Sequence, residues 1–422
     1  MESVPAQNGC VTPTVDVAML GARLHYAVPK LLYRERMLGR FFTDTFLPPS
    51  SLLHQALAAA DRIVRSDFLH RWLQRTDSEL NGATIRTFHA FGIRYALACS
   101  RASGLQERSR LYLENAREFN RRIIEHGLSS CRAVYVLDCA GAELMVHARM
   151  AGRRLLLEQT IAPKPLVTQI LKEETERWPG WEPGTCPRSL EILNERERQE
   201  WELADMILSP SHFVLDALAK MGVPSRKCRL VPYAVSLERF PLPAAHTGHH
   251  RELRVLFVGA VELRKGAIYL LEALRRLRST SIHTKLAGGI ALENSRIRQY
   301  ERWAEFLGPV SRGEMHDLYR WADVFVFPSI CEGSAIVTYE ALANGIPVIT
   351  TPNAGSVVRD GIDGLIVPIR NVEALAAAME RLACEPGVLE HLRSNAASGR
   401  QRLGLECYQQ RLRECVVEAC AA

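Results

Sequence analysis

Short apolar segments alternate with helix-like segments along most of the chain. In the first half, the helix-like residues 140–152 separate two of these apolar segments, and another helix-like stretch separates the last two. The apolar segments are residues 15–20, 133–138, 154–159, 204–211 and 229–235. Strands that alternate with helices favour a parallel sheet that is covered on both faces. We therefore expect an α/β domain in this half.

The second half shows the same alternation more clearly. Its apolar segments each end in or beside Gly, Pro or Ser, and they are residues 254–260, 283–289, 305–308, 323–329, 346–351 and 363–368. Helical periodicity occupies the stretches between them, residues 267–278, 314–322, 335–344 and 372–383. Repeated units of this kind with short loops are typical of a doubly wound α/β domain.

The change between the halves predicts the domain organisation. Residues 236–252 are rich in Pro, His and small residues and lack periodicity, which is typical of a linker. We therefore expect one domain over residues 14–235 and a second over 253–400. The amphipathic pattern of residues 401–422 predicts a helix that packs back toward the first domain. His246, His249 and His250 cluster in the linker, where solvated side chains are a better interpretation than a metal site.

Composition excludes several classes of protein. The chain has 422 residues, 47% of them hydrophobic, and no apolar run reaches the roughly 20 residues that span a bilayer. The first residues lack the basic start and apolar stretch of a signal peptide, so we expect a cytoplasmic protein. Eleven cysteines without a C-x-x-C pair are typical of reduced thiols rather than of zinc ligands or disulfides.

The net charge of +6 lies entirely in the first third, where residues 1–135 hold 18 Lys+Arg against 12 Asp+Glu. This distribution suits an anionic membrane surface or an anionic substrate. Nucleic acid is a weaker interpretation, because no known nucleic-acid-binding motif accompanies the charge. Residues 23–42 interleave five Lys+Arg and one acid with apolar residues. This stretch either lies on an anionic membrane or forms a buried helix with a solvated basic face.

The loop after the apolar segment 323–329 carries candidate chemistry, because ligands of open α/β sheets bind beyond the carboxyl ends of the strands. Glu332 and Gly333 are expected to open a helix, so that the amides of Gly333, Ser334 and Ala335 face a phosphate group. Glu332 and Glu340 would flank it, and carboxylates accept hydrogen bonds from paired hydroxyls well. The alternative is one glutamate favoured by the helix dipole and one ordinary exposed glutamate.

A second candidate loop follows the strand 254–260. It contains Gly259 and places Arg264 and Lys265 at the start of a helix. Cations at a helix N-terminus oppose the helix dipole unless an anion neutralises them, and a diphosphate would do so. The alternative is a pair of solvated loop cations.

These segments resemble the retaining GT-B glycosyltransferases of glycosyltransferase family 4, the glycosyl transferases group 1. The resemblance rests on Lys265-Gly266, on the spacing of Glu332 and Glu340, and on the segments IPVITTPNAGS and DGIDGLIVP, and it is strongest from about residue 200 to 400. It implies two Rossmann-like doubly wound domains that face a cleft. It also implies a transferase that moves a sugar from a nucleotide-diphosphate sugar to an acceptor hydroxyl with retained anomeric configuration.

The resemblance also implies roles for single residues. Lys265 with Arg264 would neutralise the donor diphosphate, Glu332 would contact the transferred sugar, and Glu340 would bind the ribose hydroxyls. The loop ending at Val310 would contact the base. Gly21, after the first strand, would approach the phosphates from the other domain.

The sequence departs from the family pattern in the first domain. Where members carry a histidine near the reacting carbon, this chain has Asp138, and His25 and His89 are the other candidates there. The chain also has Ala260 where members often carry arginine, and Val357 and Val358 where a glutamate is frequent. No D-x-D motif occurs, so we expect no metal and no cofactor besides the nucleotide sugar as co-substrate.

The family's common uses suggest a saccharide or lipid-linked acceptor in bacterial polysaccharide or glycoconjugate synthesis, with peripheral contact at the inner face of an anionic membrane and no nucleic-acid partner. Two alternatives stay open: a nucleotide-sugar 2-epimerase, and a catalytically silent relative that binds a nucleotide sugar. A Rossmann dehydrogenase is disfavoured, because no G-x-G-x-x-G follows a strand.

Overall fold

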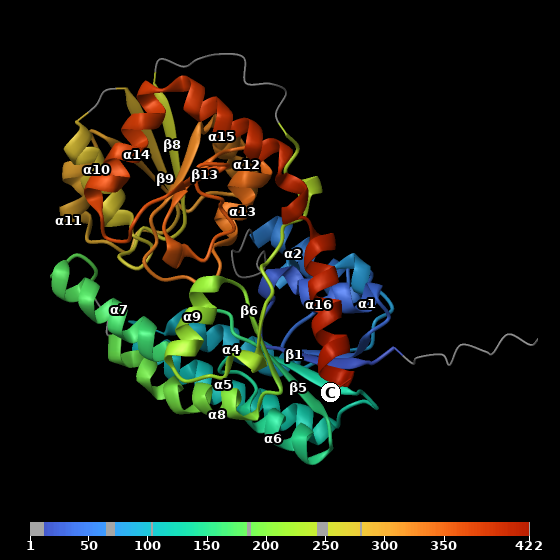
Figure 1. The fold of residues 1–422 in the computed structure, drawn as a ribbon. Helices are drawn as coiled ribbons and strands as arrows, with labels where there is room; N and C mark the ends of the chain where they lie inside the picture. Colours follow the sequence, from blue (N-terminus) through green and yellow to red (C-terminus); the bar gives the residue numbers. More distant parts are fainter. Residues whose placement is uncertain are drawn as a thin grey trace, which may run out of the picture.

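The computed structural model describes residues 12–64, 72–102, 104–183, 187–242, 252–278 and 281–421. They form two parallel sheets, each covered by helices (Figure 1). The first, which we call the N-domain sheet, has seven strands in the order β3-β2-β1-β4-β5-β6-β7. Its strands are β1 (Val15–Met19), β2 (Leu38–Thr43), β3 (Ile85–Thr87), β4 (Ala133–Leu137), β5 (Arg154–Glu158), β6 (Met206–Ser209) and β7 (Cys228–Leu230).

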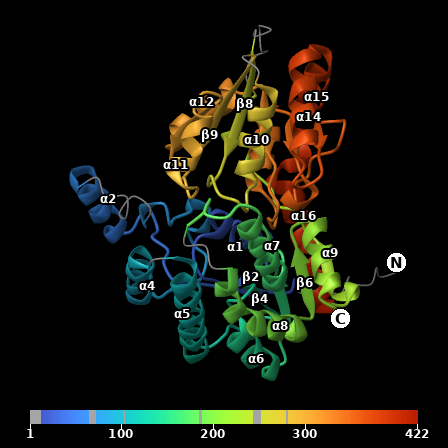
Figure 2. The ribbon, with the colours of Figure 1, turned by 90° about the vertical axis from the view of Figure 1, so that its left-hand side faces the viewer.

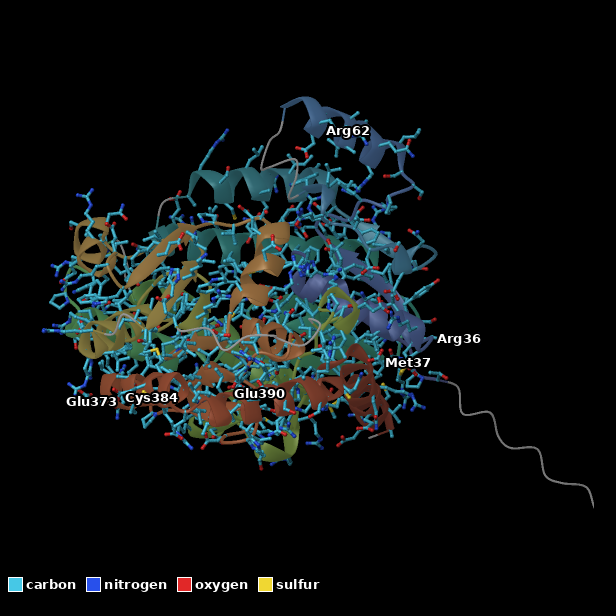
Figure 3. All side chains as sticks on the ribbon, turned by 90° about the horizontal axis from the view of Figure 1, so that it is seen from above. Arg36, Met37, Arg62, Glu373, Cys384 and Glu390 are labelled. Atoms are coloured by element: carbon cyan, nitrogen blue, oxygen red, sulfur yellow. The ribbon has the colours of Figure 1, made fainter. Side chains whose placement is uncertain are left out.

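The helices of the N-domain are α1 (Ala27–Arg34), α2 (Leu52–Val64), α4 (His89–Arg101), α5 (Gly104–His126), α6 (Ala142–Met150), α7 (Lys164–Arg177), α8 (Asn194–Leu203) and α9 (His212–Lys220). The central strands β1 and β4 are buried along their whole length, as expected for a sheet covered on both faces. Helix α2 projects beyond the rest of the domain, and Arg62 marks its outer part (Figures 2 and 3).

The second sheet, which defines the C-domain, has six strands in the order β10-β9-β8-β11-β12-β13. They are β8 (Leu253–Val258), β9 (Ile282–Ala287), β10 (Ala304–Gly308), β11 (Val324–Phe327), β12 (Val348–Thr350) and β13 (Gly364–Ile366). The helices are α10 (Ala267–Leu277), α11 (Asn294–Ile297), α12 (Arg312–Trp321), α13 (Ile336–Ala343), α14 (Val372–Cys384) and α15 (Pro386–Ser398). Glu373, Cys384 and Glu390 mark the outer side of α14 and α15 (Figure 3).

Two elements connect the domains besides the chain itself. Helix α16 (Leu405–Ala421) follows the C-domain and packs against α1, β4 and β5 of the N-domain (Figure 1). Helix α7 reaches the C-domain from the other side: the Tyr269 hydroxyl donates to Glu174 Oε2 at 2.6 Å, and Arg370 Nε donates to Glu174 Oε1 at 2.5 Å. Because Glu174 is fully buried, these contacts fix α7 against α10 and the loop after β13.

The fold expectation of two doubly wound α/β domains is confirmed, and every predicted strand is present, although several are shorter than expected. Residues 23–42 contain both a helix and a strand. The chain turns at Arg36, which has φ 57°, so that α1 ends and β2 begins within the stretch. Most of its apolar residues, among them Leu31 and Phe41, are buried, whereas Leu24 and Leu38 are half-buried. Lys30 pairs with Asp77 at 3.1 Å. Helix α1 therefore packs its apolar side into the core, as expected for the alternative of a buried helix.

Three further observations concern the sequence expectations. His246, His249 and His250 lie outside the described residues. The cysteines that the structure describes are all free thiols. No helix in the described part of the chain has the length and apolar character needed to cross a bilayer.

Candidate active site

The three residues predicted to be catalytic lie together at the carboxyl end of the C-domain sheet. Lys265 Nζ lies 2.8 Å from Glu332 Oε1, and Arg264 Nη1 lies 3.0 Å from the same oxygen. The lysine and arginine follow β8, whereas the glutamate follows the neighbouring strand β11. Adjacent parallel strands bring their carboxyl ends to one edge, which is why residues 67 positions apart in the sequence meet here.

Two glycines shape the loop that carries the cations. Gly266 is the N-cap of α10 with φ 70°, and a Cβ there would lie 2.0 Å from the Pro328 carbonyl oxygen. Gly259 has φ 143°, and a Cβ there would meet the Lys265 side chain at 3.2 Å. Only glycine satisfies both the backbone angle and the space at these positions. The loop after β8 is thereby pressed against the loop after β11.

The charges in this cluster are strongly coupled. Burial acts to raise the pKa of the Glu332 carboxyl, but the charges of Arg264 and Lys265 outweigh it and hold that pKa below its ordinary value. Glu332 is therefore ionised at neutral pH. Arg264 Nη2 also pairs with Glu262 Oε1 at 2.7 Å, and burial raises the pKa of Glu262. Sequence analysis missed Glu262, although it stands only two residues before Arg264.

The expected helix start at Glu332 is wrong, because α13 begins at Ile336. The amides of Glu332 and Ala335 donate to the carbonyls of Asn353 and Ala354 at 3.0 Å each. These bonds hold the loop against the turn after β12, so the helix begins about one turn later in the sequence than expected. The Ala335 amide is therefore not available to a phosphate.

Gly333 lies at a tight contact between the two domains. A Cβ at this position would lie 1.9 Å from the carbonyl oxygen of Thr160, which follows β5 of the N-domain. The Gly333 carbonyl also accepts a 2.5 Å hydrogen bond from Ser211 Oγ. Ser334 turns inward instead, where its hydroxyl donates to the Gly355 carbonyl at 2.9 Å.

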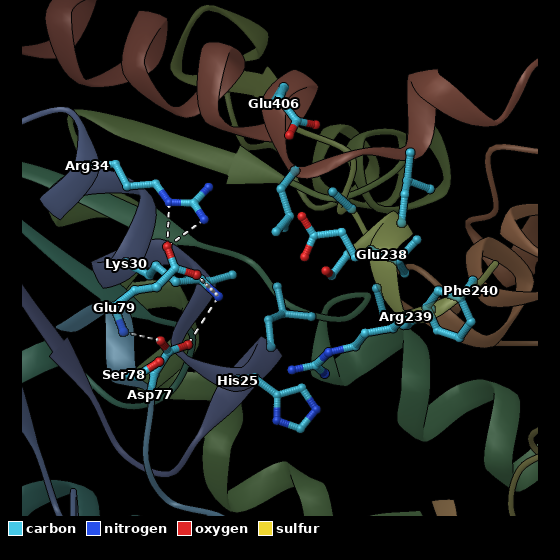
Figure 4. Close-up of a pocket in the computed structure, with 18 of the residues that line it drawn as sticks. His25, Lys30, Arg34, Asp77, Ser78, Glu79, Glu238, Arg239, Phe240 and Glu406 are labelled. Carbon is cyan, nitrogen blue, oxygen red and sulfur yellow. Dashed lines mark hydrogen bonds and ion pairs between the residues drawn. The ribbon is translucent and has the colours of Figure 1, made fainter. Parts of the chain in front are cut away.

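Glu340 lies on α13 and lines a cavity of about 880 Å³, which we call the hinge cavity. The Tyr319 hydroxyl donates to Glu340 Oε2 at 2.8 Å, and burial raises the pKa of the Glu340 carboxyl. His25, another predicted candidate, lines the same cavity together with Glu238 and Arg239 (Figure 4). The structure therefore brings Glu340 and His25 to one cavity.

A second cavity of about 960 Å³, which we call the N-domain cavity, opens at the carboxyl ends of β1, β4 and β5. Gly21 and Asp138 both line it. Gly21 has φ 92°, and its amide donates to Asp44 Oδ1 at 2.9 Å. Thr160 also lines this cavity, so the cavity reaches the contact between Thr160 and Gly333. The segment from Gly333 to Glu340, a loop followed by the first turns of α13, thus runs from the contact with Thr160 to the hinge cavity.

Asp138 is buried, and both of its carboxylate oxygens have polar partners. Its Oδ2 lies 2.7 Å from Lys164 Nζ, and its Oδ1 accepts from both the amide and the hydroxyl of Thr160. Asp138, Cys139 and Glu197 have the mutual spacing of metal ligands. However, Lys164 contacts both carboxylates, the second at 3.3 Å, and burial raises the pKa of the Cys139 thiol well above its ordinary value. An ammonium group thus occupies the position that a cation would need.

The remaining two candidates lie elsewhere. His89 begins α4 and lines a separate cavity of about 580 Å³, and its Nε2 lies 2.9 Å from Thr87 Oγ1. Val310 is half-buried after β10 and lines neither the hinge cavity nor the N-domain cavity. His89 therefore lines neither of the cavities that the other N-domain candidates line.

The walls of the N-domain cavity are the main feature that sequence analysis missed. They include Trp72, Arg75, Tyr95 and Arg108, which come from the segment before α4 and from α4 and α5. Glu182 was also missed: its Oε2 accepts from the Leu263 amide at 2.8 Å and so links the N-domain to the loop that carries the cations. No motif marks these residues, because they come from separate segments that only the fold brings together.

Residues 252–385 match the family of glycosyl transferases group 1. Among curated proteins, the chain is 28% identical over 249 residues to glycogen synthase of Mycobacterium tuberculosis, which covers 57% of this chain and 58% of that protein. It is 29% identical over 234 residues to the D-inositol 3-phosphate glycosyltransferase of Streptomyces bingchenggensis, covering 49% and 51%. The chain therefore spans between half and three fifths of the length of these two relatives.

Among solved structures, HepE of Anabaena in complex with UDP superposes with a TM-score of 0.58 at 15% identity, over 96% of this chain and 100% of that chain. At this identity the likeness concerns the fold alone. The chain therefore has the GT-B fold, and its C-domain carries the sequence pattern of the glycosyl transferases group 1.

Proposed function

We propose that this protein is a retaining glycosyltransferase that moves a sugar from a nucleotide-diphosphate sugar to an acceptor hydroxyl. The observation that carries the proposal is the convergence of Arg264 and Lys265 on Glu332 beside the start of α10. The match of the C-domain to the glycosyl transferases group 1 supports it. So does the likeness in fold to HepE, which has been solved with UDP-glucose.

The cations suit a departing diphosphate. In the transfer, the acceptor oxygen bonds to the anomeric carbon while the bond from that carbon to the phosphate oxygen breaks. The bonding electron pair goes to the diphosphate, and the acceptor's proton goes to the same phosphate oxygen. Arg264 and Lys265 stabilise the charge that develops there, which is the largest contribution that a site of this kind makes to catalysis. We propose that these two side chains take the role of a metal ion.

Glu332 competes with the donor for these cations. A diphosphate carries more negative charge than one carboxylate, so it draws Arg264 and Lys265 toward itself. The Glu332 carboxylate is then free to accept hydrogen bonds from hydroxyls of the transferred sugar. The same residue thus keeps the cations in place and contacts the sugar.

The two cavities suggest where the other groups bind. Glu340 faces the hinge cavity, and the Tyr319 hydroxyl fixes one of its oxygens, so it can accept from the paired hydroxyls of a ribose. We place the acceptor in the N-domain cavity, because that cavity ends at Thr160, against the loop that contains Glu332 and Gly333. A saccharide or lipid-linked saccharide of bacterial polysaccharide or glycoconjugate synthesis, met in the cytoplasm, is the acceptor that the family resemblance suggests.

The test is donor turnover with a matched pair of lysine variants. Purified protein is incubated with a panel of nucleotide sugars, with and without saccharide acceptors, and release of nucleoside diphosphate is measured. Lys265→Ala is expected to lower turnover about 100-fold, because it removes one charge-stabilising donor. Lys285→Ala removes a lysine that contacts Glu305 and Trp321 instead, and is expected to leave turnover within twofold.

Three outcomes would contradict the proposal. Equal turnover in Lys265→Ala and the unaltered protein would mean that the cluster does not hold the diphosphate. Conversion of the donor to its epimer without any acceptor would indicate the 2-epimerase. A protein that binds the donor but turns over none of the panel would be the silent relative.

A further inference from the structure

The N-domain cavity has an unusual balance of charge. Its walls carry Arg23, Arg75, Arg108 and Lys164, and the one carboxylate among the described residues that line it is Asp138. Lys164 and Asp138 neutralise each other at 2.7 Å. Within the described ranges, none of the three arginines forms an ion pair with an acid that lines the cavity, although Arg23 lies within electrostatic reach of Asp138.

The three arginines differ in how they are held. Arg75 pairs with Asp44, which lies behind the wall and is almost fully buried. Arg23 Nη2 donates to the Thr160 carbonyl at 3.3 Å. Arg108 is exposed on α5, and in the part of the chain that the structure describes it contacts no carboxylate. Arg108 is therefore the arginine of this cavity whose charge is most available to a ligand.

The hinge cavity provides an internal comparison. It has a similar volume, but its lining holds five carboxylates, from Asp77, Glu79, Glu238, Glu340 and Glu406, against three Lys+Arg. Lys30 and Arg34 in that lining pair with Asp77 and Glu79 (Figure 4). The two large cavities beside the candidate site thus differ in sign, and the positive charge of the N-domain cavity is not a general property of the protein surface.

Aromatic rings complete the N-domain cavity. Trp72, Tyr95 and Tyr112 line it together with Leu20 and Ile161. Aromatic faces pack against the apolar faces of sugar rings and against hydrocarbon chains, whereas guanidinium groups bind phosphate oxygens in pairs. The volume of about 960 Å³ is at the upper end of the range of small-molecule sites.

We propose that the N-domain cavity binds an acceptor that carries a phosphate group, with Arg108 as its principal cation and the aromatic residues against the rest of the molecule. The proposal rests on the proposed function, because it takes the ligand of this cavity to be the acceptor. The phosphate lies at the Arg108 end, and the accepting hydroxyl lies at the Thr160 end, next to Glu332. The phosphate belongs either to a soluble sugar phosphate or to a prenyl diphosphate carrier.

The test measures binding by calorimetry after the donor site has been saturated with UDP, so that Arg264 and Lys265 cannot bind the probe. Glucose 6-phosphate represents the soluble source, geranyl diphosphate represents the carrier, and glucose is the neutral control. We expect one of the two phosphate probes to bind and glucose not to bind. Arg108→Gln should weaken that binding at least tenfold and leave UDP affinity unchanged.

Arg110→Gln is the matched control, because Arg110 lies on the same helix but pairs with Glu114 outside the cavity. It should leave binding of the phosphate probe within twofold. Failure of both phosphate probes to bind would overturn the proposal, and so would equal loss in the two arginine variants. If UDP itself does not bind, the proposed function fails, and titration of the probes into nucleotide-free protein still tests the cavity.

Discussion

Replacement of Gly333 by alanine should separate the two domains at the tight contact between Gly333 and Thr160. The added Cβ would lie 1.9 Å from the Thr160 carbonyl oxygen, whereas contacts of this kind are essentially never shorter than 3.0 Å. The loop or the N-domain must therefore shift by about 1.1 Å, the difference between these two distances. Both partners are backbone, so no side chain can rotate to relieve the overlap. The same shift lengthens the hydrogen bond from Ser211 to Gly333.

A displacement of about 1 Å in a positioned active site costs roughly 100-fold in rate. We therefore expect Gly333→Ala to lower kcat about 100-fold, with a smaller effect on UDP affinity, because the diphosphate cations belong to the C-domain alone. The assay is steady-state release of UDP from the active donor, together with small-angle scattering to detect a more open shape. Gly313→Ala is the control, since a Cβ there meets nothing within 4 Å. A kcat for Gly333→Ala within threefold of the unaltered protein would refute this account of the interdomain contact.

Three other perturbations follow from the structure. Glu340→Gln should weaken UDP binding about tenfold but barely change binding of 2′,3′-dideoxy-UDP; equal losses for both ligands would exclude contact with the ribose hydroxyls. Glu174→Gln should lower the free energy of unfolding, measured in urea, by about 2–4 kcal/mol, because it disrupts a buried ion pair with Arg370. The control Glu176→Gln changes an exposed residue and should alter the free energy of unfolding by less than about 0.5 kcal/mol. Burial acts to raise the pKa of Glu143, but hydrogen bonds and charge from Arg196 outweigh it and lower that pKa to about 2. The stability from this pair is therefore present above about pH 4.5 and is lost as pH falls toward 2. Urea unfolding across this range should show a flatter pH dependence for Glu143→Gln, and an unchanged profile would contradict the pairing.

The C-domain could be predicted from the sequence because its strands lie in short apolar segments that end in or beside Gly, Pro or Ser. The N-domain was harder. Residues 38–43 mix arginine with phenylalanine and contain Gly39, which looks unlike a strand. A Cβ at Gly39 would lie 2.6 Å from Asp16 Oδ1. The close contact between β1 and β2 therefore requires glycine at this position. Tertiary contacts of this kind leave no local pattern.

Some residues of the candidate site could likewise be predicted from the sequence, and others could not. Lys265 and Glu332 could be found because each follows a predicted strand, and strands of a parallel sheet share one ligand-binding edge. The start of α13 could not, since Glu332 and Gly333 look like a helix opening until their loop is seen to bond to residues 353–355. Asp138 is a candidate in the sequence, yet in the structure Lys164, 26 residues away, neutralises it. Such pairings depend on the assembled fold.

We propose that Lys265 and Arg264 bind the diphosphate of a nucleotide sugar. A structure of the protein with UDP bound tests it most directly. The account predicts phosphate oxygens within about 3 Å of Lys265 Nζ and of the Arg264 guanidinium, as in charge-assisted hydrogen bonds, with the ribose hydroxyls on Glu340. A diphosphate bound away from both cations, with the Lys265–Glu332 pair intact, would contradict it.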